Sequence, residues 1–139
     1  HHASTRWEVK YLPGGLVDIE FIAQYLQLRE AHASPEVLST NTREALARLC
    51  TAGAIDGADA DTLISALKLW QAVQSMLRLS LDGDSGLGDG DSLPEALKQA
   101  LARAASEPDF VRLTTRMDET AKAAHGIFDR IVNRSRELE

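Results

Sequence analysis

Two carboxylates, Asp18 and Glu20, stand in the most distinctive stretch of the chain, which runs from Pro13 to Gln24 and reads PGGLVDIEFIAQ. A close pair of carboxylates can hold a metal ion or divide acid and base catalysis between its members. The apolar residues around these two recur at helical spacing, and residues that are two apart on a helix lie about 200° apart around its axis. The spacing therefore disfavours a catalytic carboxylate pair.

The start of the predicted helix offers Asp18 a structural role instead. Gly14 and Gly15 allow the backbone to turn sharply before a helix that we expect to begin at about Leu16. Gly15 is then the N-cap and Asp18 the third helical residue, where a carboxylate can accept hydrogen bonds from free backbone N–H groups. The sequence alone leaves this local role and a functional role for Asp18 both open.

Other polar candidates lie on the expected helices. Glu20, Gln24 and Gln27 follow one another at four- and three-residue intervals and are predicted to form a polar stripe apart from the apolar face. Arg78, on a later helix, is interpreted as a surface charge, because a long arginine can reach water from an apolar face. The alternative is that Arg78 pairs with an acidic group across the bundle.

No other motif gathers catalytic side chains. His32 and His125 are isolated, and the single cysteine, Cys50, is interpreted as a buried apolar residue that excludes an internal disulfide. The Asp- and Gly-rich residues 82–92 superficially resemble a calcium loop, but the twelfth position, where such a loop needs a glutamate, is Leu93. We find no zinc spacing, no phosphate-binding glycine loop and no nucleophile elbow.

The elements that must position these residues are helices. Start signals come from Asn41 with Glu44 and from two serines, Ser92 and Ser106, that are each followed by an acidic residue three positions later. With the apolar periodicity, they predict helices over about 16–31, 41–53, 60–81, 92–105 and 106–138. The expected fold is all-α, a single helical bundle of about five helices with a long C-terminal helix. That last helix could alternatively form a dimeric coiled coil.

Residues 1–12 are expected to stand apart from a bundle domain formed by residues 13–139. His1–Ser4 is interpreted as the remnant of an expression tag, and the absence of an initial Met suggests an excised fragment. Apolar residues alternate with charged ones from Thr5 to Leu12, which predicts an extended leader.

Composition bounds the class of protein. The 139 residues are 44% hydrophobic and 26% charged, which is typical of one folded domain rather than a disordered chain. The net charge of −6 argues against nucleic acid as a partner. No apolar run reaches the roughly 20 residues of a membrane helix, so we expect no membrane partner and a cytoplasmic location.

The stretch Lys10–Phe21, followed by Gln24, resembles the K-x-G-x-G-G-[IL]-x-D-I-E-F-x-x-Q signature of glutamine synthetase adenylyltransferases, the bifunctional adenylylating and deadenylylating enzymes. Leu12 departs from it, because the family commonly has a glycine there. The resemblance extends through Asn41–Arg43 and the long Leu-rich helix. It covers most of the chain, as the C-terminal helical domain that follows a nucleotidyltransferase domain.

The resemblance implies a role in nitrogen metabolism, as part of a multifunctional enzyme. The domain would pack on a nucleotidyltransferase core that uses Mg²⁺ and ATP, with glutamine synthetase and the PII signalling protein as partners. This chain has no such core, so we expect no cofactor in it and no catalysis by it alone. Its position at a chain end fits the adenylylating half.

The candidates for interdomain or substrate-facing positions share the signature or the long helix: Gly14, Gly15, Asp18, Glu20, Gln24 and Arg78. Asp18 or Glu20 would accept a hydrogen bond from a basic residue of the absent core. A stand-alone helical module that recruits a protein partner is the alternative function.

Overall fold

The computed structural model describes residues 5–81 and 93–134, and within these ranges the chain is helical without strands. The α-helices are α1 (Leu16–Glu30), α2 (Thr42–Thr51), α3 (Gly57–Leu81), α4 (Glu95–Ala104) and α5 (Phe110–Phe128). A 3₁₀ turn, η1 (Pro35–Val37), follows α1, and a π-helical turn, η3 (Asp129–Asn133), continues α5. The predicted all-α bundle with a long C-terminal helix is confirmed.

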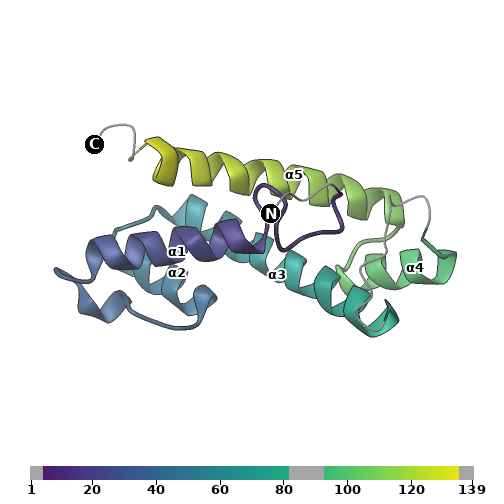
Figure 1. The fold of residues 1–139 in the computed structure, drawn as a ribbon, viewed down its shortest axis with the longest axis horizontal. Helices are drawn as coiled ribbons and strands as arrows, with labels where there is room; N and C mark the ends of the chain where they lie inside the picture. Colours follow the sequence, from purple (N-terminus) through teal and green to yellow (C-terminus); the bar gives the residue numbers. More distant parts are fainter. Residues whose placement is uncertain (1–4, 82–92, 135–139) are drawn as a thin grey trace.

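Helix α3 is the central element of the bundle. In Figure 1, α5 runs along one side of the molecule, α1 and α2 lie together toward one end, and α4 lies at the other end. Helix α3 contacts α1, α2, α4 and α5. One continuous core results, with Trp70 of α3 among its largest fully buried side chains. None of the helices described is long and apolar enough to cross a membrane.

Two helix starts follow the predicted signals and three are shifted. Helix α4 begins at Glu95 with Pro94 as its N-cap and no side-chain cap, rather than at Ser92. The Asn41 side chain accepts a hydrogen bond of 2.8 Å from the N–H of Glu44, as predicted. Asp56 accepts from Asp59 in the same way, so α3 begins at Gly57, three residues before the predicted start. Helix α5 is capped by Asp109 rather than by Ser106, because the Asp109 carboxylate accepts from the N–H of Arg112.

The extended leader predicted for residues 5–12 is wrong. These residues form consecutive turns, in which the N–H groups of Tyr11 and Leu12 both donate to the carbonyl oxygen of Glu8. Trp7 and Val9 are buried in the same core as the helices, and the Trp7 ring stacks on Phe110 with centroids 5.7 Å apart. The alternating pattern thus reflects side chains buried by turns, and this segment packs with the bundle. The predicted tag remnant, residues 1–4, lies outside the described residues, as does the acidic loop 82–92.

Candidate functional site

The two glycines of the signature occupy positions that only glycine fits. Gly14 has a φ of +82°, and a Cβ placed on it would come within 2.1 Å of the carbonyl oxygen of Ala121 on α5. A Cβ on Gly15 would lie 2.3 Å from the carbonyl oxygen of Val9. The double glycine therefore lets the turn that precedes α1 contact both α5 and the N-terminal turns.

The Asp18 carboxylate forms a hydrogen bond within this turn. One carboxylate oxygen accepts a 2.7 Å hydrogen bond from the N–H of Gly14, reaching back from the third residue of α1. The carbonyl oxygen of the same glycine accepts a 3.0 Å bond from the indole Nε1 of Trp70. The local role considered for Asp18 is therefore present in the structure, and both polar groups of the Gly14 residue are used within the domain.

Glu20 and Gln24 point away from the bundle. Both are exposed, and the Glu20 carboxylate forms no hydrogen bond or ion pair with any of the described residues. Gln27 does not belong to the same stripe, which corrects the prediction: it is buried, its Oε1 accepts from the N–H of Ser39 at 2.8 Å, and its Nε2 donates to the carbonyl oxygen of Ala23. The exposed stripe therefore ends before Gln27, which instead attaches the chain after η1 to α1.

Exposed apolar side chains lie on the same side of α1 as Glu20 and Gln24. Val17, Phe21 and Leu28 of α1 have exposed fractions of 36%, 46% and 82%. Phe21 rests partly against Phe128 of α5, with ring centroids 5.9 Å apart, and Phe128 in turn stacks on His125. We refer to Val17, Glu20, Phe21, Gln24 and Leu28 as the outer face of α1.

Sequence reasoning did not identify the apolar part of this outer face. A signal was present, because Val17, Phe21, Gln24 and Leu28 follow a 4-3-4 spacing. The same helix carries a second set of apolar residues, Ile19, Ile22, Ala23 and Leu26, on the opposite side. The helical spacing predicts this second set as the apolar face, and the structure confirms that it is buried.

Arg78 lies apart from the other candidates. It is exposed near the end of α3, which agrees with its interpretation as a surface charge. The structure thus brings Gly14, Gly15 and Asp18 into one turn and places Glu20 and Gln24 on the adjoining outer face.

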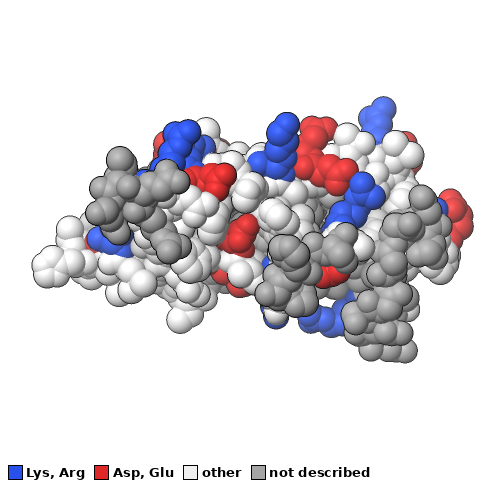
Figure 2. All heavy atoms as spheres, turned by 45° about the horizontal axis from the view of Figure 1, so that its top comes forward, with Lys and Arg blue, Asp and Glu red and all other residues white. Residues whose placement is uncertain are grey.

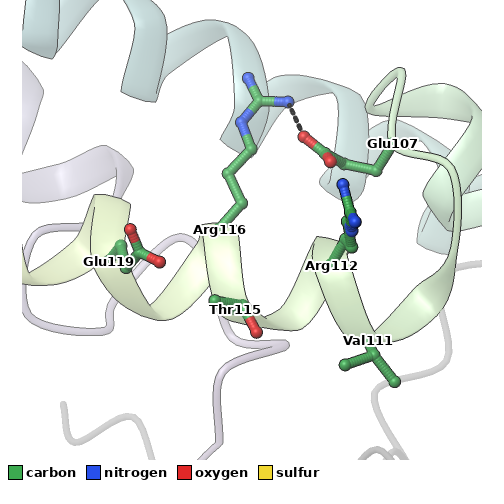
Figure 3. A pocket seen from close by; sticks show the side chains of 6 residues that line it. All are labelled: Glu107, Val111, Arg112, Thr115, Arg116 and Glu119. Carbon is green, nitrogen blue, oxygen red and sulfur yellow. Dashed lines mark hydrogen bonds and ion pairs between the residues drawn. The ribbon is translucent and has the colours of Figure 1, made fainter.

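A shallow hollow of about 450 Å³ on α5 contains none of the predicted site residues (Figure 3). It is lined by Glu107, Val111, Arg112, Thr115, Arg116 and Glu119. Arg116 donates to the Glu107 carboxylate at 3.0 Å and to the carbonyl oxygen of Ala105 at 2.8 Å. Its guanidinium thus holds the turn between α4 and α5 together, which is a structural role.

Charge is mixed over the surface that Figure 2 shows, where basic and acidic side chains alternate along the molecule. Arg130 donates two hydrogen bonds of 2.6 and 3.1 Å to the carboxylate of Asp59. These bonds, and the negative charge of Asp59, raise the pKa of Arg130 above its ordinary value. In residues 5–81 and 93–134, no three His, Cys, Asp or Glu side chains are grouped so that they could hold a metal ion.

Comparison with known proteins connects this chain to nucleotide-transferring enzymes. The model of the GlnD PII-uridylyltransferase family matches residues 1–132. The bifunctional glutamine synthetase adenylyltransferase/adenylyl-removing enzyme of Rhodopseudomonas palustris (strain TIE-1) is 40% identical over 126 residues, which cover 91% of this chain.

Two other relatives bear the same name. The enzyme of Xanthobacter autotrophicus is 38% identical over 131 residues, 94% of this chain, and that of Rhizobium meliloti is 40% identical over 129 residues, 91% of this chain. The match spans only 12–13% of the length of these three relatives. The similarity thus covers nearly all of this chain and a small part of each relative.

Proposed function

The chain belongs to the GlnD PII-uridylyltransferase family, and from this membership we propose that it is a helical domain of an enzyme that adenylylates and deadenylylates glutamine synthetase. The observation that carries the proposal is the 40% identity, over 91% of the chain, to an enzyme named for those two activities. The names of the relatives favour adenylyl transfer over the uridylyl transfer named in the family description.

The domain's contribution is architectural. Nucleotidyl transfer depends on carboxylates that position metal ions around the phosphates, and we assign Mg²⁺, ATP and the transfer step to a nucleotidyltransferase core of the same polypeptide. This chain packs on that core and helps to shape the surface that meets glutamine synthetase. By itself it has no transferase activity.

The exposed residues of the signature support this role. The turn at Gly14 and Asp18 is held internally, so it presents α1 in a fixed orientation. Glu20 and Gln24 then remain directed outward, which suits a contact with the core. PII is proposed as the regulatory partner of the whole enzyme, which acts in the cytoplasm in nitrogen metabolism.

The test compares the full-length protein encoded with this chain to the isolated chain. Each is incubated with glutamine synthetase, ATP and Mg²⁺, and mass spectrometry follows the addition of AMP to the synthetase and its removal. We expect both activities from the full-length protein and neither from the isolated chain.

A full-length protein without a nucleotidyltransferase signature and without either activity would contradict the proposal. It would favour the second candidate, a stand-alone helical module that recruits a protein partner. In that case the isolated chain alone should bind its partner as tightly as the full-length protein does.

A further inference from the structure

The outer face of α1 has the pattern of a helix that packs against another helix. Val17, Phe21, Gln24 and Leu28 follow the 4-3-4 spacing of the a and d positions in a heptad repeat. At 1.5 Å per residue this row extends along about 17 Å of α1. Three of its four members are apolar and exposed, while the opposite side of α1 supplies Ile19, Ile22, Ala23 and Leu26 to the core.

These apolar side chains are arranged for contact along the helix rather than scattered. Leu28 is 82% exposed and Phe21 46% exposed, and both lie in one row with Val17. Isolated exposed apolar residues are common on soluble proteins, whereas a contiguous group indicates an interaction surface. An amphipathic helix that docks with anchors at such spacing would remove this row from water.

Glu20 constrains the chemistry of the docking helix. It flanks the row beside Val17 and Gln24, so a docked helix would partly remove its carboxylate from water, which is costly unless a cation pairs with it. Helix α1 offers no cation, because the residues three and four positions away are Leu16, Val17, Ala23 and Gln24. None of the ion pairs among the described residues involves Glu20, so a pairing cation would come from the docked helix.

We infer that the outer face of α1 is the docking site of an amphipathic helix that carries a basic residue opposite Glu20, and that this helix belongs to the part of the polypeptide outside residues 1–139. The inference rests on the proposed function. The matched region is only 12–13% of the length of the relatives, so a protein of that kind has much further sequence that could supply the helix. A helix on the same polypeptide docks at high effective concentration, so a modest apolar row suffices to hold it. Glu20, rather than Asp18, is then the carboxylate that reaches across the interface, because the Asp18 carboxylate is bonded to Gly14.

Hydroxyl-radical footprinting tests whether the face is covered. The oxidation rates of Phe21 and Leu28 are measured in the full-length protein and in the isolated chain, which has a closed core of its own. Both rates should fall severalfold in the full-length protein. Equal rates in the two proteins would overturn the inference, while the adenylylation assay judges the proposed function separately.

The identity of the occupant is tested by concentration and by cross-linking. Protection that appears in the isolated chain as its concentration rises would assign the face to a second copy and overturn the inference. A photo-reactive amino acid at Gln24 of the full-length protein should cross-link to residues three and four apart outside residues 1–139. Cross-links without helical spacing would contradict a helical partner.

The charge pairing has a matched control on α5. Glu20→Lys in the full-length protein should abolish the protection of Phe21 and Leu28, because two cations would then face each other. Glu119→Lys changes the charge of another exposed glutamate in the middle of a helix and should leave the protection intact. Protection that survives Glu20→Lys would overturn the assignment of a basic partner residue.

Discussion

The indole Nε1 of Trp70 donates a buried hydrogen bond of 3.0 Å to the carbonyl oxygen of Gly14, 56 residues earlier in the chain. Through this bond the central helix α3 holds the turn that starts α1, while the N–H of the same glycine is held by Asp18. The backbone of α5 closes the third side of the turn at Ala121. Helices α3 and α5, together with Asp18 of α1 itself, thus fix the direction in which α1 presents its outer face.

Replacing Trp70 with phenylalanine should lower the free energy of unfolding by about 2–4 kcal/mol. The substitution leaves the carbonyl oxygen of Gly14 buried without its donor and opens a cavity where the indole was. Urea denaturation followed by circular dichroism measures the change. Trp7→Phe is the matched control, because the indole Nε1 of Trp7 has no hydrogen-bond partner in the described part of the chain. It should cost less, and equal losses would show that the bond to Gly14 contributes little.

Gly14→Ala should destabilise the domain by about 3 kcal/mol or more. A positive φ alone costs an L-residue about 1–2 kcal/mol, and here the new Cβ would also meet the backbone of α5 at 2.1 Å. Gly53→Ala separates the two effects, since Gly53 has a φ of +80° with nothing within 4 Å of the added Cβ. Thermal denaturation should show a small loss for Gly53→Ala and a large one for Gly14→Ala. Similar losses for both would argue against the close approach of α5.

Asp18→Ala should cost about 1–2 kcal/mol, because it leaves the partly buried N–H of Gly14 without its hydrogen-bond acceptor. Asp18→Asn keeps an oxygen that can accept from the N–H of Gly14 and should cost less. In the full-length enzyme, Asp18→Asn should therefore adenylylate glutamine synthetase at nearly the normal rate. A stable Asp18→Asn enzyme with a strongly reduced rate would instead show that the negative charge itself acts across the interface.

Arg130 and Asp59 should show a coupling free energy of about 1 kcal/mol in a double-mutant cycle with Arg130→Met and Asp59→Asn. Their side chains form two hydrogen bonds between η3 and the start of α3, but the arginine is largely exposed, which limits the gain. The folded-state pKa of Arg130 is raised, so its contribution would be lost only as the pH rises through that value. The coupling should accordingly be equal at about pH 7 and pH 9, where arginine stays charged. Coupling indistinguishable from zero would show that solvent screens the pair completely.

Most of the fold could be predicted from local signals. Helix start and stop residues act on neighbouring backbone groups, so Gly15 with Leu16 and Asn41 with Glu44 placed two helices correctly. The predicted starts of α3, at about residue 60, and of α5, at Ser106, were wrong for the same reason. Several neighbouring side chains could cap each helix, and the sequence does not show which of them does. Only the folded chain shows which oxygen accepts the bond.

The prediction of an extended segment at residues 5–12 failed for a different reason. Alternation of apolar and charged residues is compatible with a strand or with turns that bury every second side chain. The residues against which the segment packs decide between a strand and turns. Here Trp7 is buried and stacks on Phe110, which lies more than a hundred residues away in the sequence. No local pattern in the sequence reports that contact.

By itself, the sequence determined the helical fold, the double glycine before α1 and the family to which the chain belongs. The tertiary structure decided how the polar groups of the signature are used. It hydrogen-bonds Asp18 to Gly14 and leaves Glu20 exposed beside Val17 and Gln24. Helical periodicity predicted the buried face of α1, but whether the second apolar row of the helix is covered depends on the packing of α3 and α5 against α1.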